Sequence, residues 1–225
     1  MKIADIEAKI EQGDCSEGTI ELFKAALKRV PKYNRCQHCY TTAAAIPPRF
    51  YKQAITMIQY GLDEHCNDWV DRMRSYHNMA IILEKSGDYI GALKSYKDAL
   101  SSIAPDKQFS YSSEYAAHMM RAEMHITDFN YSEDLFNYYS IAIQADSFNQ
   151  AFQMKVFYRS IAEIIIFTKQ GDLTSAQRAF ETANEMLCPN YIGPLTQLLK
   201  RHGFMEATGA TKEAIEFLKR TAHSF

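Results

Sequence analysis

The sequence predicts an all-α protein built from tandem antiparallel helix pairs. Two observations lead to this fold class. Amphipathic helical patterns follow one another along the whole chain, and the residues that separate them recur at a fixed spacing. The spacing is clearest for Gly87 and Gly171, which stand 84 residues apart. Because one helical hairpin cannot bury its apolar face alone, the hairpins are expected to stack into an α-solenoid.

The two clearest copies of the repeat cover residues 75–105 and 159–189. Each has two amphipathic helical patterns on either side of a Gly-Asp dipeptide, and a proline closes each copy. The coincidence of several positions at one offset indicates a true repeat. Besides the two glycines, the matching pairs are Asp88 and Asp172, Ala92 and Ala176, Tyr96 and Phe180, Ala99 and Ala183, and Pro105 and Pro189.

The chemistry of these positions predicts a helical hairpin. Glycine ends a helix by adopting a left-handed conformation, the following Asp caps the next helix, and proline is expected to stop the second helix. The small residues Ala92 and Ala99 allow two helices to approach closely, while the large Tyr96 fills the space beside them.

Further copies account for the rest of the chain. Gly13-Asp14 marks one near the start, Pro47-Pro48 precedes another helix, and half of the 84-residue offset falls at Phe129-Asn130-Tyr131, where Tyr131 matches Tyr89. A last copy begins at Gly209. The prediction is therefore a single domain over residues 1–225 with about six helix pairs, at 2–30, 34–61, 72–103, 114–145, 156–187 and 192–222.

Gly-Asp-Tyr followed by Ala92, Tyr96, Ala99 and Pro105 resembles the tetratricopeptide repeat signature. The likeness covers nearly the whole chain. Tyr76 stands where that signature has tryptophan, and the copies are longer than the family's usual repeat. The resemblance implies a TPR-like right-handed superhelix, in which the first helix of each pair lines a concave face that binds a partner.

The inward positions implied by the resemblance are a mixture of apolar and charged residues. Because His77 and Ile81 occupy the leading pair, a clamp for a terminal carboxylate is disfavoured, and an extended or helical peptide held by apolar side chains is expected. Burial between adjacent hairpins remains an alternative for the apolar members. The expected binding residues are Arg74, His77, Ile81, Glu84, Met119, Glu123, Ile126, Tyr158, Ile161, Ile165 and Lys169.

Composition argues against several classes of partner. The formal net charge of −2 provides no positive surface for nucleic acid or an anionic membrane. The most apolar stretch, residues 161–167, is far short of the ~20 residues of a membrane helix. The N-terminal residues do not resemble a secretory signal. The five scattered cysteines do not resemble a disulfide framework and suit a reducing compartment, so a cytoplasmic location is expected.

Cys36-Gln37-His38-Cys39 is the one run that suggests chemistry. With His65-Cys66 it could supply zinc ligands, although the spacing is poor for a structural zinc site. A redox role is the second hypothesis, because Asn34 could cap a helix whose first turn holds Cys36, and a helix N-terminus lowers the pKa of a thiol. The alternative is that these cysteines are small apolar residues on a packed helix. Without a glycine-rich phosphate loop or another catalytic motif, we expect no enzyme activity, no cofactor and no metal.

The leading hypothesis is a non-enzymatic scaffold or adaptor that binds a protein or peptide on the concave face. An alternative is a regulatory sensor that resembles the repeat domains of bacterial receptors for short signalling peptides. A homodimer through the terminal repeats is a further alternative, because residues 211–225 combine charges with Ile215, Phe217 and Leu218.

Overall fold

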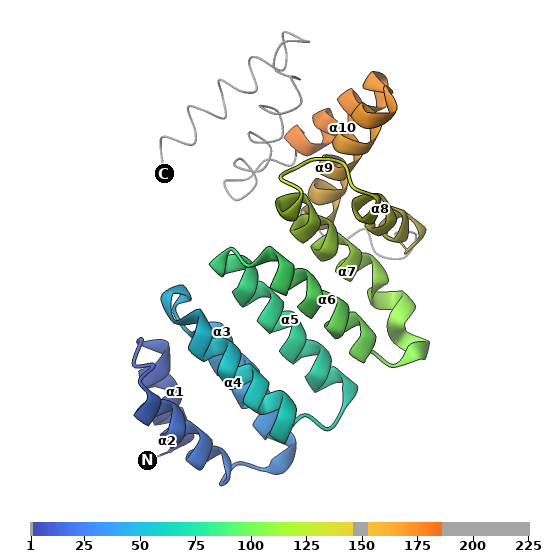
Figure 1. Ribbon diagram of the computed structural model, residues 1–225. Helices are drawn as coiled ribbons and strands as arrows, with labels where there is room; N and C mark the ends of the chain where they lie inside the picture. The colour runs from blue at the N-terminus through green and yellow to red at the C-terminus, as the bar shows by residue number, and fades with distance from the viewer. Residues whose placement is uncertain (1, 146–152, 186–225) are drawn as a thin grey trace. The chain divides into compact units, whose positions relative to one another are not determined.

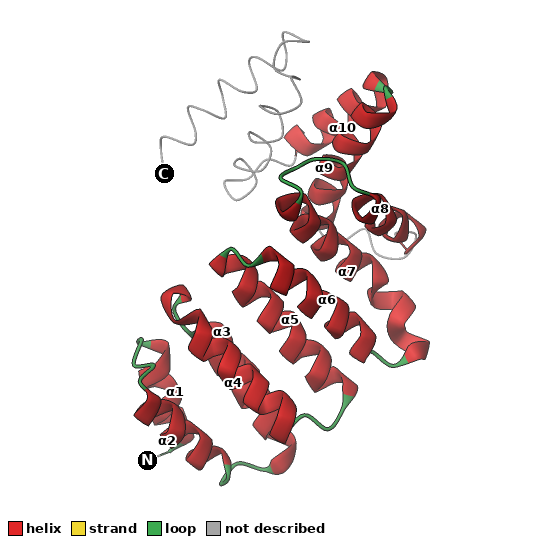
Figure 2. Cartoon of the chain, in the orientation of Figure 1, coloured by secondary structure: helices red, strands yellow, loops and turns green. Residues whose placement is uncertain are grey.

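The computed structural model describes residues 2–145 and 153–185, and this part of the chain is all-helical with no strand (Figure 2). None of its helices is both long and apolar enough to cross a membrane. The α-helices are α1 (Ile3–Glu11), α2 (Glu17–Leu27), α3 (Arg35–Ala45), α4 (Tyr51–Glu64), α5 (Trp69–Ser86), α6 (Tyr89–Ser102), α7 (Pro105–Ile126), α8 (Glu133–Ala145), α9 (Gln153–Gln170) and α10 (Leu173–Glu185), with short 3-10 turns η1 (Lys32–Asn34) and η2 (Pro48–Phe50).

The chain forms two compact units, Met1–Tyr111 and Ser112–Phe225, and the division falls within α7. The first five predicted helix pairs each correspond to two consecutive helices. The sixth, at 192–222, lies outside the described residues, as do Gly209 and the terminal residues considered for a homodimer. The single-domain expectation remains a prediction.

The turns after α5 and α9 have the predicted Gly-Asp chemistry, whereas after α1 the residue that caps the next helix is Ser16 and not Asp14. Gly13, Gly87 and Gly171 all have positive φ, at 98°, 85° and 78°. After α5, the Gly87 N–H donates to the Glu84 carbonyl and the Asp88 N–H donates to the Leu83 carbonyl. This hydrogen-bond pattern is typical of an α-helix that ends at a residue in the left-handed conformation. The Asp88 carboxylate then accepts from the Gly91 N–H at 2.9 Å and caps α6. The predicted glycine and aspartate roles are confirmed here.

The turn between α7 and α8 departs from the 42-residue register. Asp128 and Phe129 have positive φ, at 53° and 59°, and take the places of Gly87 and Asp88 in the hydrogen-bond pattern. Ser132 accepts from the Leu135 N–H and caps α8, so Tyr131 lies in the turn, whereas Tyr89 begins α6. The expected match between these two tyrosines is therefore wrong, because this turn is longer.

The expected role of Pro105 holds only in part, because α6 does end before this proline but Pro105 itself begins the next helix. Helix α6 ends at Ser102, and Pro105 is the first residue of α7. A proline at the first helical position lacks only an N–H that has no intrahelical partner, and its fixed φ suits a helix. The first helix of this pair therefore begins nine residues before the predicted 114.

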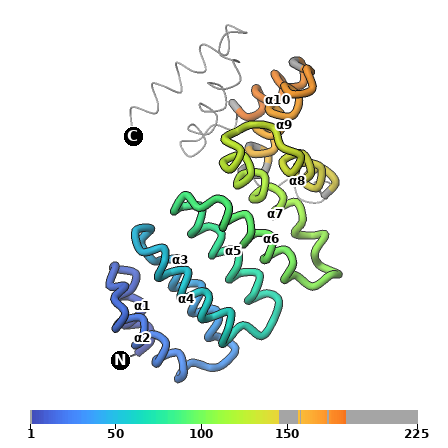
Figure 3. The backbone as a smooth tube through the Cα atoms, in the orientation of Figure 1, coloured from blue at the N-terminus to red at the C-terminus, as the bar shows by residue number. Residues whose placement is uncertain are grey.

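Within the first unit, consecutive helices pack as pairs (Figures 1 and 3). Contacts join α1 to α2, α3 to α4 and α5 to α6, and further contacts join α1 to α3 and α3 to α5. One continuous core includes the fully buried Phe23, Leu27 and Ile58. The first pair thus packs against the second, and the second against the third.

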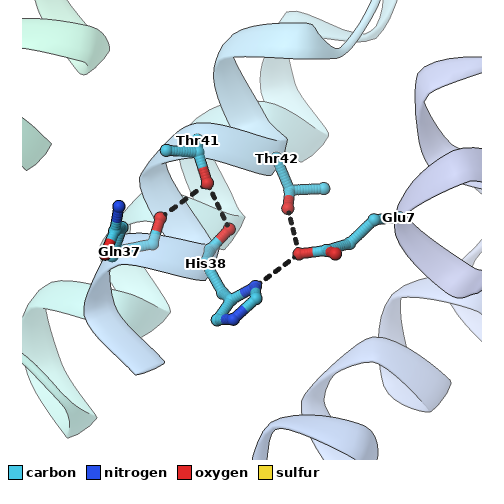
Figure 4. A network of polar contacts seen from close by, with 5 residues as sticks. All are labelled: Glu7, Gln37, His38, Thr41 and Thr42. Atoms are coloured by element: carbon cyan, nitrogen blue, oxygen red, sulfur yellow. Dashed lines mark hydrogen bonds and ion pairs between the residues drawn. The ribbon is translucent and has the colours of Figure 1, made fainter. Parts of the chain in front are cut away.

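A polar network also ties α1 to α3 (Figure 4). The Glu7 carboxylate lies 2.6 Å from His38 Nδ1 and accepts from the Thr42 hydroxyl at 3.0 Å. Since these side chains are partly buried, the contacts are better shielded from solvent than a surface ion pair. They orient the N-terminal helix on the second pair.

The repeated alanine and aromatic positions are buried as predicted. The fully buried residues at these positions include Ala92, Tyr96 and Ala99 in the first unit and Ala176 and Ala183 in the second. The Tyr96 hydroxyl donates to Glu84 at 3.1 Å, so its polar end has a partner.

In the second unit, contacts join α8 to α9 and α9 to α10. The Tyr139 hydroxyl on α8 donates to Glu163 on α9 at 3.2 Å. Burial and the negative charge of Glu163 raise the pKa of Tyr139 to about 12, so the phenol stays protonated and keeps this bond.

Candidate functional site

Within the described residues, a candidate binding site is a pocket of about 430 Å³ in the first unit, between α3 and α5. We call it the α3–α5 pocket. Both helices are the first of their pairs, and the resemblance to tetratricopeptide repeats implies that a partner binds to such helices. Its lining is Ala44, Ala45, Ile46, Pro47, Pro48, Tyr51, Asn78, Ile81, Ile82 and Lys85.

The sequence explains why a hollow forms at this place. Helix α3 ends at Ala45, and Ile46 takes an extended conformation because it precedes a proline. Ala44 and Ala45 carry only methyl groups and are exposed, so they leave room beside α5. The η2 turn and Tyr51 form the adjoining wall.

Helix α5 contributes one face to the pocket. Asn78, Ile81, Ile82 and Lys85 are three to four residues apart, and this spacing places side chains on one side of a helix. The Asn78 amide donates to the Arg74 carbonyl at 2.9 Å, which leaves its carboxamide oxygen as an acceptor. Lys85 is exposed and is the one charged residue in the lining. The pocket therefore combines an apolar wall with a single cation.

Two other pockets in the first unit are less suited to an apolar ligand. One, of about 390 Å³, lies between α2 and α4, and the salt bridge between Lys24 and Glu21 forms part of its lining. The other, of about 270 Å³, is lined mostly by polar residues such as Lys32, Asn67 and Asp68. Neither is lined by several isoleucines, as the α3–α5 pocket is by Ile46, Ile81 and Ile82.

The structure places the four expected binding residues of α5 in different environments. Ile81 lines the α3–α5 pocket, and Arg74 is exposed, with its guanidinium 3.5 Å from the Tyr40 hydroxyl. This hydrogen bond raises the pKa of Arg74 above its usual value. The His77 ring makes an edge contact with the Tyr96 ring, and the Glu84 carboxylate accepts a hydrogen bond from the Tyr96 hydroxyl. Both residues therefore contact α6.

The expected binding residues of the second unit are mostly buried. Glu123 accepts from the Ser132 hydroxyl at 2.7 Å and so supports the cap of α8. The exposed members are Ile126 and Lys169. The buried members, whose side chains contribute packing to this structure, are Met119, Glu123, Tyr158, Ile161 and Ile165.

The cysteines that suggested a metal or redox site are arranged differently from either expectation. Cys36 forms a disulfide with Cys66, not with Cys39. Asn34 is at the start of α3, but its side chain makes no cap bond. In residues 2–145 and 153–185, no three His, Cys, Asp or Glu side chains are grouped to hold a metal ion. The expectation that all these cysteines are unpaired packing residues is wrong for Cys36 and Cys66, because the fold brings them together.

Sequence reasoning missed most of the α3–α5 pocket. Of its lining, only Ile81 was among the expected binding residues. Pro47-Pro48 marked the turn, but nothing in the repeat pattern indicated that Ala44 and Ala45 would leave space opposite Lys85.

No protein-family model matches this chain, and a comparison with curated proteins finds no similar sequence.

Proposed function

We propose that the protein is a non-enzymatic scaffold or adaptor that binds a segment of another protein, and that the α3–α5 pocket holds one apolar side chain of that segment. The observation that carries the proposal is the position of this pocket between the first helices of two consecutive pairs. A TPR-like superhelix would present this surface to a partner. Contacts of α3 with both α1 and α5 support such a stacking.

The lining indicates the chemistry of the partner segment. Ile81, Ile82 and Tyr51 offer apolar contact area, which favours an aliphatic or aromatic anchor. Lys85 is the one charge beside them, so an acidic residue near the anchor is favoured over a basic one. Asn78 adds a hydrogen-bond acceptor for a backbone N–H of an extended segment.

Selection from a library of displayed random peptides tests the proposal without a known partner. Wild-type protein is expected to enrich peptides that combine an apolar residue with a nearby Asp or Glu. The Ala45→Arg variant places a long side chain in the pocket from an exposed position, so it is expected to bind these peptides at least tenfold more weakly, about 1.4 kcal/mol.

Thr41→Arg is the matched control, because Thr41 is exposed one turn earlier on α3 and does not line the pocket. A second pair separates charge from shape. Lys85→Glu is expected to weaken binding of the acidic peptides, and Lys94→Glu, with the same change in net charge on α6, is expected to leave it intact. Equal binding by Ala45→Arg and Thr41→Arg, or no enrichment by wild type, would contradict the proposal.

A further inference from the structure

Cys36 and Cys66 form a covalent link that the repeat pattern does not explain. Cys36 is the second residue of α3, and Cys66 lies two residues after the end of α4. Their Cα atoms are 5.2 Å apart, within the range of protein disulfides, and their exposed fractions are 0% and 5%. The bond thus ties the start of the second helix pair to the connection that leads into the third.

The surroundings of this bond suit both its oxidised and its reduced form. The Ser75 hydroxyl on α5 lies 3.4 Å from Cys36 Sγ and 3.5 Å from Cys66 Sγ. A hydroxyl both donates and accepts, so two thiols at this site would keep a polar partner. Helices α3, α4 and α5 also pack through a shared apolar core, which includes Ala43, Met57 and Met79. Their packing therefore does not depend on this bond alone.

The other described cysteines are poor candidates for the same chemistry. Burial, with a smaller contribution from Glu7, raises the pKa of Cys39 to about 12. Burial also raises the pKa of Cys15. Since the thiolate is the reactive form, both stay largely unreactive near neutral pH. Among the described residues, the Cys36–Cys66 pair is the one disulfide, so it is where we look for thiol–disulfide exchange.

We propose that the Cys36–Cys66 bond is a reversible crosslink, opened and closed by thiols and disulfides of the glutathione class. This inference does not depend on the proposed binding function. It accounts for a disulfide in a chain whose five cysteines otherwise suit a reducing compartment, where the disulfides that do form are usually transient.

The two sulfurs have different roles in the opening reaction. A glutathione thiolate attacks the Sγ of Cys66, which is the less buried residue of the two, and the Cys36 sulfur leaves with the electron pair of the broken bond. The first turn of α3 stabilises negative charge on this departing sulfur. A second glutathione thiolate then attacks the glutathione sulfur of the mixed disulfide and releases Cys66 and glutathione disulfide. Both protein thiolates take protons from water, and glutathione disulfide closes the bond by the reverse steps.

Opening the crosslink is expected to lower thermal stability. The bond joins residues 30 positions apart, and a loop of this length is constrained in the unfolded chain. For a chain of this size the expected difference in Tm is about 10 °C between the oxidised and reduced forms.

The test equilibrates the full-length protein in buffers with varied ratios of reduced to oxidised glutathione, followed by denaturation, alkylation and peptide mass analysis. Cys36 and Cys66 are expected to become alkylated together as reduced glutathione increases and to become protected again when the oxidised form is added. The Tm is expected to fall at the same glutathione ratio at which Cys36 and Cys66 become alkylated. The control Cys15→Ser is expected to behave as wild type does.

The double variant Cys36→Ser, Cys66→Ser is expected to have a Tm that does not respond to glutathione. If this variant fails to fold, the Tm of wild-type protein reduced with glutathione still measures the effect of opening the Cys36–Cys66 bond. Three results would overturn the proposal: protection of Cys36 and Cys66 that persists in excess reduced glutathione, alkylation of both in excess oxidised glutathione, or a wild-type Tm that is the same in both states.

Discussion

Gly61 offers a sharp test of how closely α3 and α4 pack. A Cβ added at this buried position in α4 would lie 2.7 Å from the Cys39 Cβ and 3.2 Å from the Cys39 Sγ. Carbon atoms normally rest about 3.5 to 4 Å apart. The Cys39 Cβ is fixed to the backbone of α3, so it cannot rotate away, and the two helices would have to separate.

The magnitude for Gly61→Ala follows from two opposed effects. Alanine is better than glycine in a helix by about 1 kcal/mol, whereas overpacking a core costs about 1 to 3 kcal/mol. Because a helix must move rather than a side chain, we expect the upper part of that range and a net loss of about 1 to 2 kcal/mol in the free energy of unfolding.

Gly18→Ala is the matched control. Gly18 lies in α2, and a Cβ there would meet nothing within 4 Å, so this change is expected to stabilise the protein by roughly 0.5 to 1 kcal/mol. Urea unfolding followed by circular dichroism measures both variants. Adding Cys39→Gly removes the clashing Cβ, and the double-mutant cycle with Gly61→Ala should show a coupling above about 1 kcal/mol. The close-packing argument is refuted if Gly61→Ala is as stable as Gly18→Ala.

Three further predictions concern a turn, a contact and a titration. Gly87→Ala should cost about 1 to 2 kcal/mol in urea unfolding, because its φ of 85° is strained for alanine while nothing lies within 4 Å of the added carbon; an unchanged midpoint would contradict this. His38→Ala should increase amide hydrogen exchange in α1, because it removes the contact with Glu7, and unchanged exchange there would show that the network does not hold this helix. Burial lowers the pKa of His125 below 6.5, so the unfolded chain binds a proton at higher pH than the folded chain, and stability should fall as the pH drops from 7 to 5.5. Thermal melts of His125→Gln should show a smaller fall in Tm over this pH range. An equal fall in wild type and variant would exclude this histidine as its source.

Of the expected binding residues, only Ile81 lines the α3–α5 pocket, so the sequence did not indicate the composition of this candidate site. The resemblance to a repeat family directed attention to the first helices, and Ile81 does line a pocket there. Periodicity identifies apolar residues on a helix, but it does not say whether a neighbouring element covers them. Met119, Ile161 and Ile165 have the same pattern as Ile81, and all three are buried.

The sequence by itself determined the helices and three of the turns between them. The conformations of Gly13, Gly87 and Gly171, and the caps formed by Asp88 and Asp172, follow from the chemistry of each residue and its immediate neighbours. Such features are local, so they can be recognised from a few consecutive letters.

Only the tertiary structure decided which distant residues meet. Cys36 and Cys66 are 30 positions apart, and their pairing depends on how α3 and the end of α4 are placed by packing around Ser75. The α3–α5 pocket likewise exists because small side chains at the end of α3 face larger ones on α5. These outcomes depend on distances between elements, and the order of residues along the chain does not specify those distances.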